Sequence, residues 1–354
     1  MSQEPSSMAE LCDRIGPPDR SAARFAAVRL RTLARPPGAL GRLDELVPRI
    51  SAIRGDPAPG PLPAVISVLA ADHGLARHSA SAFPQHAGGR VLALALSGRA
   101  PVNILADRVS AQFACADFGL TQPVGDPEYR MGPGTGDISV EDAMSAALAE
   151  RAVLGGARYA QSRLGDEPLV AVGEIGIGNT TAAAALAAVL LDLPPDAVVG
   201  AGSGVDASGV ARKHGLVAQA LHRTARISRD DPMALIAALG GFEIAGNVGV
   251  ILAAAAARRV VVLDGFITGV AALLAVRLCP QASAYLVAAH RSAEPGHQPV
   301  LEAIGLEPLL DLGMRLGMGS GAAMVLGLIN TTLELARSTP RARDVGLALQ
   351  EGDT

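Results

Sequence analysis

Two glycine-rich stretches carry the residue types that bind phosphate groups. GEIGIGNTT, residues 173–181, combines three glycines with Asn179, Thr180 and a second threonine. AGSGVDASGVARK, residues 201–213, is another glycine loop, and it ends on Lys213, the only lysine of the chain. Glycine loops let backbone amides approach an anion, and a lysine adds a compact positive charge. The two stretches together predict a site for a phosphomonoester.

The first loop also holds a carboxylate, Glu174, in what its sequence indicates is a glycine turn. We interpret it as a group for acid–base work or for ribose hydroxyls, with a solvated loop glutamate as the alternative. Asn179 is expected to cap the helix that follows, and an ordinary capped helix is the alternative to an anion site. The loop lacks the GK[ST] signature, so nucleoside triphosphates are not indicated.

The histidines do not predict a metal site. Asp72 and His73 are adjacent, and His290 and His297 are separated by a glycine- and proline-containing loop, which is not a ligand motif. The cysteines that would complete a zinc site are missing from these stretches. We therefore expect no bound metal.

A methionine stands in a third glycine turn, RLGMGSGAA, residues 315–323. Met318 lies between two glycines directly before an apolar run that is typical of a helix, for which Ser320 is the expected N-cap. Such turns usually bring backbone or a polar side chain close to a ligand, and a thioether accepts hydrogen bonds only weakly.

Short apolar runs precede polar, glycine-containing loops along the chain, and Ala- and Leu-rich helical segments follow these loops. Six runs are expected to be strands: AVISVLA, AQFACA, LVAV, AVVG, VVVL and AYLVAA. The alternation predicts an α/β fold with a mostly parallel six-stranded sheet and helices on both faces. Ligands bind at the carboxyl ends of such strands. The polar residues expected to converge there are Asp72, His73, Asp117, Glu174, Asp264, His290 and Ser292.

The N-terminal part of the chain has a different pattern. Residues 20–53 alternate apolar and basic positions at helical spacing, and Pro36, Pro37 and Gly38 predict a turn between two helices. The proline-rich segment 55–64 is a connector into the main body.

Composition excludes several classes of partner. The 354 residues carry a formal net charge of −4, which disfavours nucleic acids and anionic membranes. Cys12, Cys115 and Cys279 are widely spaced and are expected to be free thiols, with Cys115 in a strand core. The first residues lack the apolar region of a secretory signal, and charges or glycines interrupt the apolar runs. We expect a cytoplasmic protein.

Taken together, these motifs resemble the nicotinate-nucleotide–dimethylbenzimidazole phosphoribosyltransferase family of cobalamin lower-ligand assembly. The similar stretches lie in family order between about residues 30 and 330. They are PPGALGRLDEL, ADHGLARHSASAFPQ, GTGDISVEDAMS, GEIGIGNTT, GSGVDASGVARK, GGFEIAG, VVLDGFITGVAALLA, HRSAEPGH and EPLLDLGMRLGMGSGAA. The combination of motifs is specific for this family, although each glycine loop alone would be weak evidence for the resemblance.

The resemblance implies a Rossmann-like α/β domain over residues 61–324 and a small helical domain from residues 1–60 and about 325–354. It also implies a homodimer. The implied reaction moves phosphoribose from nicotinate mononucleotide to 5,6-dimethylbenzimidazole and yields nicotinate and α-ribazole 5′-phosphate, with no cofactor.

The resemblance also assigns roles to single residues. Phosphate and ribose would be held by Gly176, Asn179, Thr180, Gly202, Gly204, Lys213 and Ser292. The base pocket would be lined by Ser81, Phe83, Gln85 and Leu316. Glu174 would face the ribose or the nicotinate.

Met318 departs from the family, in which this position typically carries the glutamate that takes the azole proton. The resemblance therefore implies a transferase weakened by Met318. The alternatives are a paralogue that binds the nucleotide without catalysis or uses another acceptor, or a partner subunit of an active paralogue.

Overall fold

The computed structural model describes residue 5 and residues 7–347. The strands are β1 (Ala64–Ala71), β2 (Gln112–Gly119), β3 (Leu169–Ile175), β4 (Val260–Leu263) and β5 (Leu286–Ala288). The helices of the first half are α1 (Met8–Asp13), α2 (Arg20–Arg31), α3 (Arg42–Arg54), η1 (Gly74–His78), α4 (Ala87–Leu96), α5 (Pro101–Arg108), η2 (Pro127–Tyr129) and α6 (Ala146–Arg163). Those of the second half are α7 (Asn179–Leu191), α8 (Pro195–Val198), α9 (Ala207–Arg223), α10 (Pro232–Leu239), α11 (Phe242–Ala256), α12 (Phe266–Leu278), η3 (Pro280–Tyr285), α13 (His297–Ile304), α14 (Ser320–Ser338) and η4 (Ala342–Val345).

A parallel sheet forms the centre of the molecule. Its strand order is β2-β1-β3-β4-β5, and each neighbouring pair is parallel. Strands β1, β3, β4 and β5 are buried along their whole length, whereas β2 lies at the edge and is partly exposed. Apolar runs without alternation are typical of strands covered on both faces. The α/β prediction is confirmed.

The expected sixth strand is absent from the described residues, where the sheet has five strands. The run AVVG at 197–200 was predicted to be a strand, and its first residues instead belong to the short helix α8. Pro195 explains the difference, because proline at the start of a helix has its φ preset and loses no hydrogen bond there.

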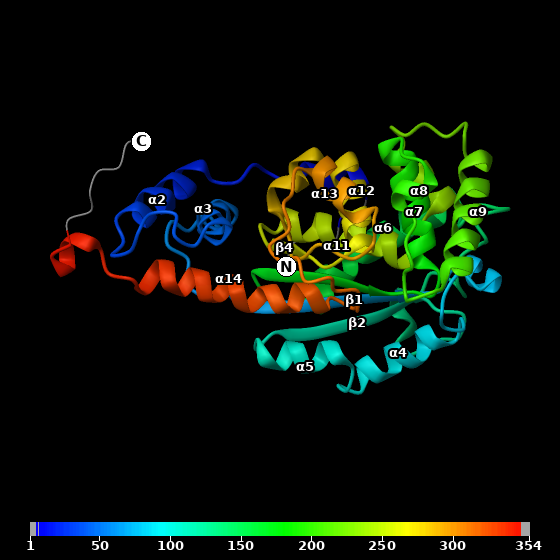
Figure 1. Cartoon of the computed structure of the whole chain (residues 1–354), viewed down its shortest axis with the longest axis horizontal. Helices are drawn as coiled ribbons and strands as arrows, with labels where there is room; N and C mark the ends of the chain where they lie inside the picture. Colours follow the sequence, from blue (N-terminus) through cyan, green and yellow to red (C-terminus); the bar gives the residue numbers. More distant parts are fainter. Residues whose placement is uncertain (1–4, 6, 348–354) are drawn as a thin grey trace.

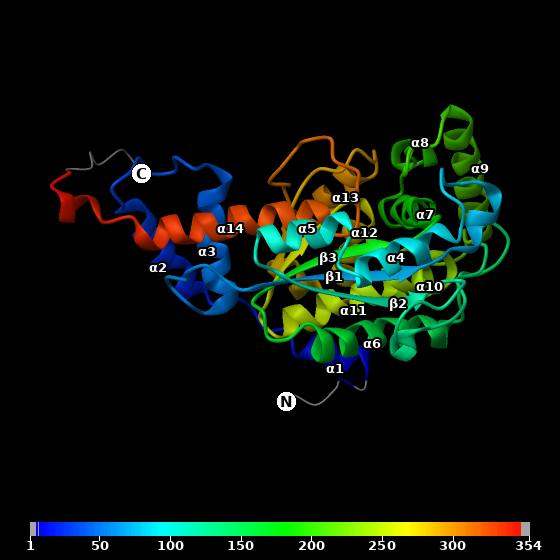
Figure 2. The same ribbon diagram turned by 90° about the horizontal axis from the view of Figure 1, so that it is seen from below.

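Helices cover both faces of the sheet (Figures 1 and 2). Helix α11 packs across β1, β2, β3 and β4 on one face, with α6 outside it. Helices α4, α5 and α14 lie against the other face. Because the strands are parallel, their carboxyl ends meet at one edge, and the loops that follow them lie together there.

The α6–α11 contact depends on small residues. A Cβ on Gly156 of α6 would lie 2.7 Å from the carbonyl carbon of Gly246 in α11. A Cβ on Gly249 of α11 would lie 2.8 Å from the backbone nitrogen of Ala157. The two backbones therefore touch, which explains how a chain with only 3% aromatic residues forms a dense core.

The two helices predicted within residues 20–53 are present as α2 and α3, with the expected turn between them. They pack beside the far end of α14, away from the sheet (Figure 1). Arg29 donates to the backbone carbonyl of Arg337 at 2.8 Å, and Leu33 forms a bridge with Arg341. The division into two domains stays a prediction, and residues 1–4, 6 and 348–354 of its outer ends lie outside the described residues.

The cysteines have no disulfide partner among the described residues. Cys115 lies on the edge strand β2 and is only partly buried, so it is not the strand-core residue that the sequence indicated. The sulfur of Cys12 in α1 lies 3.9 Å from the carbonyl oxygen of Leu278, and the sulfur of Cys279 lies 3.9 Å from the carbonyl oxygen of Cys12. In the described part of the chain, no helix is long and apolar enough to span a membrane.

Gly249→Ala tests the close packing of α6 and α11. We expect it to lower the free energy of unfolding by about 1–3 kcal/mol, because a methyl group would force the two backbones apart. Gly215→Ala in α9 is the control, since a Cβ there meets nothing within 4 Å. The control is expected to gain about 0.5–1 kcal/mol. Urea denaturation measures both, and equal effects would contradict the packing argument.

Candidate active site

A cavity of about 390 Å³ lies at the carboxyl ends of the strands. It is lined by Phe83, Val91, Leu94, Ala100, Pro101, Glu174, Ile175, Gly176, Asn179, Thr180, Gly202, Ser203, Asp264, Gly265, Phe266, Ile267, His290, Ser292, Glu294, Arg315, Leu316, Gly317 and Met318. One end collects glycine-loop amides and hydroxyls, and the other is largely apolar. Such a cavity suits an elongated ligand with a polar and an aromatic end.

Four of the seven polar residues expected at the strand ends line this cavity: Glu174, Asp264, His290 and Ser292. The other three also lie at the carboxyl ends of β1 and β2, as predicted, but they do not line this cavity. Asp72 accepts bonds from the amide and hydroxyl of Thr121 at 2.9 and 2.8 Å. His73 pairs with Glu243 at 2.8 Å, and Asp117 accepts the amide of Leu120 at 2.8 Å. These three residues hold loops rather than a ligand.

The first glycine loop leads from β3 into α7, as its sequence predicted. Gly178 is the N-cap, with φ of 98°, so Asn179 is the first helical residue rather than the predicted cap. Its side chain is free to donate to Oε2 of Glu174. Gly176 has no room for a side chain, since a Cβ there would lie 2.9 Å from the carbonyl oxygen of Ala71. The loop therefore presents backbone and small polar groups to the cavity.

Lys213 lies fully buried behind the second glycine loop. Its Nζ donates to the carbonyl oxygen of Gly200 at 2.7 Å and to Oγ1 of Thr180 at 3.1 Å. Burial lowers the pKa of this lysine. The ammonium thus links the two glycine loops and places a positive charge at the polar end of the cavity. It does not itself line the cavity, whose wall here is Thr180 and Gly202.

Glu174 belongs to a strand and not to a glycine turn, which corrects the sequence interpretation. It is the sixth residue of β3 and is paired with Leu69 of β1. Burial raises the pKa of its carboxyl to about 8, and the nearby charges of Glu243 and Asp264 act in the same direction. A carboxyl with such a pKa can exchange protons near neutral pH.

Met318 lies in a run of three left-handed residues. The φ angles are 78° for Gly317, 60° for Met318 and 77° for Gly319. A left-handed φ is uncommon for a residue with a side chain and is found most often at functional sites. The Met318 side chain is 8% exposed and lines the cavity. A Cβ at position 317 would lie 3.5 Å from Oε1 of Glu174, so this turn rests against that carboxylate.

Asp264, at the end of β4, holds this turn. One of its carboxylate oxygens accepts the amide of Gly319 at 3.1 Å, and the other accepts the amides of Gly321 and Ala322 at 2.7 and 3.1 Å. Helix α14 begins at Ser320 with Gly319 as its N-cap, so the predicted capping by Ser320 is wrong. The carboxylate of Asp264, at the end of strand β4, supplies the cap of helix α14 instead.

The four residues expected to line the base pocket divide into two groups. Phe83 and Leu316 line the cavity, both more than half exposed. Ser81 and Gln85 do not line it. The Ser81 hydroxyl pairs with that of Ser203 at 3.1 Å, and Gln85 donates to the carbonyl of His73 at 3.3 Å. Gly204 lines a second, open cavity of about 800 Å³ that shares Phe83, Ser203 and Leu316 with the first.

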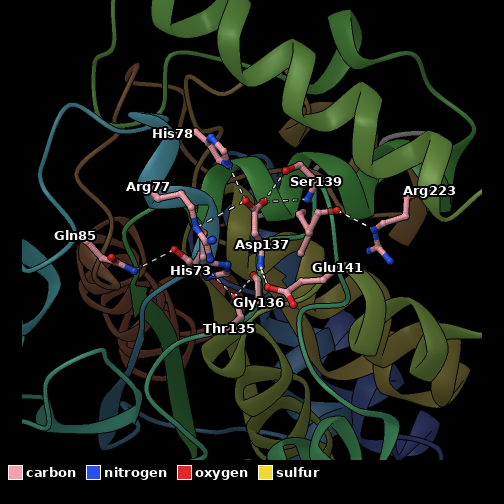
Figure 3. Close-up of polar contacts among 12 residues, drawn as sticks. His73, Arg77, His78, Gln85, Thr135, Gly136, Asp137, Ser139, Glu141 and Arg223 are labelled. Atoms are coloured by element: carbon pink, nitrogen blue, oxygen red, sulfur yellow. Dashed lines mark hydrogen bonds and ion pairs between the residues drawn. The ribbon is translucent and has the colours of Figure 1, made fainter.

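The segment that carries Ser81, Phe83 and Gln85 is anchored through Asp137 (Figure 3). Asp137 accepts the Ser139 hydroxyl at 2.7 Å and pairs with Nε2 of His78 at 2.6 Å, at the end of η1. Hydrogen bonds from Ser139 and His78 hold the pKa of this aspartate below its usual range, although burial opposes them. The segment 79–86 thus begins at a fixed residue, His78, and is held further along by the contacts of Ser81 with Ser203 and of Gln85 with His73.

Sequence reasoning missed Asp264 as the residue that holds the turn, and it missed Glu294 and Arg315 in the cavity wall. Glu294 follows Ser292 in the same motif, and Arg315 directly precedes the glycine turn. Both positions could have been noted as charges beside predicted ligand loops. The pairing of Asp264 with amides more than fifty residues away has no local signal. In the described residues, no three His, Cys, Asp or Glu are grouped so that they could hold a metal ion.

Comparisons with known proteins give a consistent result. A phosphoribosyltransferase family model, DBI_PRT, matches residues 15–346. The nicotinate-nucleotide–dimethylbenzimidazole phosphoribosyltransferase of Roseiflexus sp. (strain RS-1) is 42% identical over 338 residues, covering 93% of this chain and 95% of the relative. The protein of the same name from Azotobacter vinelandii is 41% identical over 329 residues, covering 90% and 92%. The crystal structure of that enzyme from Thermus thermophilus matches with a TM-score of 0.87 at 36% identity, covering 94% and 99%.

Asp264→Ala tests the role of this carboxylate in holding the turn. Three buried amides would lose their acceptor, so we expect unfolding to become easier by about 1–3 kcal/mol or more. Asp206→Ala is the matched control, because Asp206 caps α9 at an exposed position through the amide of Gly209 at 2.8 Å. Loss of an exposed cap typically costs about 1 kcal/mol. Urea denaturation compares them, and a smaller loss for Asp264→Ala than for the control would refute the role.

Proposed function

The chain belongs to the nicotinate-nucleotide–dimethylbenzimidazole phosphoribosyltransferase family, and from this membership we propose that it carries out the family's transfer. Phosphoribose would pass from nicotinate mononucleotide to 5,6-dimethylbenzimidazole, giving α-ribazole 5′-phosphate and nicotinate, in cobalamin biosynthesis. The observation that carries the proposal most directly is a cavity that combines residues of two glycine loops, backed by the Lys213 ammonium behind Thr180, with apolar side chains such as Phe83 and Leu316. No cofactor enters this reaction scheme.

The polar end of the cavity is suited to the phosphate and ribose. Gly176, Thr180 and Gly202 line it, and the Lys213 ammonium lies directly behind Thr180. Backbone amides together with a nearby ammonium group are a common arrangement for holding a phosphomonoester. Asn179 and Ser292 also line the cavity and would bind the ribose. Phe83, Leu316 and Phe266 would enclose the flat acceptor base.

The chemistry requires little of the protein beyond positioning. The C1′–N bond to nicotinate breaks, and its electron pair returns to a ring nitrogen that is already cationic, so no proton donor is needed. The acceptor nitrogen forms a new bond to C1′ from the opposite face, which inverts β to α. The azole N–H then loses its proton to a base.

We propose that Glu174 takes this proton in the present chain. Met318 occupies the position of the family's glutamate and accepts no proton, whereas Glu174 lies against the same turn with a raised pKa. Met318 then acts as an apolar contact for the base and slows the reaction. The close likeness to enzymes over nearly the whole chain favours catalysis over a binding-only paralogue or an inactive partner subunit. A homodimer, a cytoplasmic location and the absence of nucleic-acid partners stay predictions.

Met318→Glu tests the departure from the family. We expect kcat/KM for 5,6-dimethylbenzimidazole to rise by roughly 10²–10⁴-fold, because a general base is restored beside the acceptor. Met318→Gln is the matched control, since glutamine has nearly the same shape and accepts no proton. Nicotinate release from nicotinate mononucleotide measures both variants. Equal gains for the two would mean that shape and not base strength limits the reaction.

The pH dependence tests Glu174. Only its ionised form accepts a proton, so kcat/KM is expected to increase as the pH rises through about 8, the pKa that burial gives this carboxyl. Glu174→Gln is expected to remove this limb and to slow the reaction by roughly 10²-fold or more. Initial rates on both sides of that pKa measure the profile. A rate that does not change with pH across this range in the unchanged protein would exclude Glu174 as the base.

A further inference from the structure

A carboxylate occupies the polar end of the cavity. Glu294, in the loop between β5 and α13, accepts the amide of Gly202 through Oε1 at 2.8 Å. That amide belongs to the second glycine loop, and its partner in the proposed complex would be the substrate's phosphate. Gly200, whose carbonyl accepts from Lys213, packs directly beneath Glu294, since a Cβ there would lie 2.7 Å from Oε2. A side-chain anion therefore fills part of an anion site.

The contact that holds this carboxylate is incomplete. Oε2 of Glu294 is buried and has no hydrogen-bond partner in the described part of the molecule. A buried carboxylate oxygen without a partner loses hydration and gains nothing in return. The Glu294 charge partly offsets the lowering of the pKa of Lys213 by burial, so the two charges compensate each other. One hydrogen bond therefore holds the Glu294 carboxylate, and its second oxygen contributes none.

Glu294 also has a place to go. Glu294 also lines a third hollow, of about 310 Å³, which is separate from the two cavities described above and lies on the outer side of the same loop. Arg291 and Gln298 line that hollow, and Arg291 pairs with Asp311 at 3.2 Å. The residues on either side, Ala293 and Pro295, are exposed. A rotation of the Glu294 side chain would thus move its charge from the inner cavity to a solvated pocket with an arginine.

We propose that Glu294 is a placeholder for the donor's phosphate: it occupies the Gly202 amide in the empty protein and moves outward when the phosphate binds. This inference rests on the proposed function, because the phosphate is that of the nucleotide donor. A carboxylate and a phosphate dianion cannot share one amide and one buried ammonium, since like charges a few ångströms apart repel strongly where burial limits screening by water.

The exchange has two consequences for the reaction. Lys213 is never left as an uncompensated buried charge, which would be costly in the empty protein. When the Glu294 carboxylate returns to the Gly202 amide, it also competes with the phosphate of the product and so assists product release. Donor affinity is correspondingly reduced, because the binding-competent arrangement is only a fraction of the empty population.

Glu294→Gln tests the placeholder. Glutamine keeps the acceptor for the Gly202 amide and removes the charge that opposes the phosphate. We expect the Kd for inorganic phosphate and for nicotinate mononucleotide, measured by isothermal titration calorimetry, to fall by roughly tenfold. The KM for nicotinate mononucleotide should fall with it. Glu302→Gln on α13 is the control, because it removes the same charge from an exposed position and should change neither constant.

A static supporting role for Glu294 predicts the opposite sign. If Glu294 only fixes the loop, Glu294→Gln would leave both Kd values unchanged or raise them, and the proposal would be overturned. Glu294→Ala is a second variant in case glutamine disturbs folding. It removes both the charge and the acceptor that occupies the Gly202 amide, so it too should tighten binding.

The proposed function and the placeholder role of Glu294 are tested independently of each other. If nicotinate mononucleotide does not bind the unchanged protein, the proposed function fails, while the inorganic phosphate titrations of the variants still decide whether Glu294 occupies an anion site. If the nucleotide binds and Glu294→Gln does not tighten it, the placeholder fails and the proposed function stands.

Discussion

The bonds between the Asp264 carboxylate and three amides at the start of α14 are the constraint on which the site depends. They join the end of β4 to a turn more than fifty residues later. The turn is pressed against β3, where a Cβ on Gly173 would lie 2.6 Å from the carbonyl carbon of Met318. Asn247 of α11 adds a hydrogen bond to the carbonyl of Gly173 at 3.1 Å from the other side. The left-handed conformation of Met318 is maintained because its surroundings leave no alternative.

Compensation between buried charged groups governs the remaining chemistry. Glu174 and Asp264 lie close enough to raise the pKa of Glu174, while the Asp264 carboxylate is itself engaged by backbone amides. At the polar end of the cavity the buried cation is Lys213, and Glu294 lies beside it. Burial is the main cause of the shifted pKa values of Glu174 and Lys213, and the neighbouring charges modify them further. A neutral Met318 beside Glu174 fits this balance, because a second ionised carboxylate there would add to the repulsion.

The sequence predicted the α/β class, the two helices of residues 20–53 and the loops that form the cavity. These depend on local patterns: apolar runs, proline and glycine positions, and helix starts. It was wrong where two local interpretations compete. AVVG has β-branched residues, yet Pro195 makes it part of a helix. Glu174 stands among glycines, yet pairing with Leu69 extends β3 through it. Ser320 looks like a cap, yet Asp264 takes that role from a distance.

The sequence by itself determined that the loops at the strand ends meet, because parallel strands must end at a common edge, and the first glycine loop begins at the end of β3. It also determined that position 318 bears a side chain without a proton-accepting group. Only the tertiary structure decided which polar residues face the cavity. His73 stands at a strand end in the sequence just as Asp264 does, but Glu243, far along the chain, engages it. Asp117 instead accepts the amide of Leu120 in the loop that follows its strand. Side-chain direction, burial and pairing between distant segments are set by packing, and no local pattern encodes them.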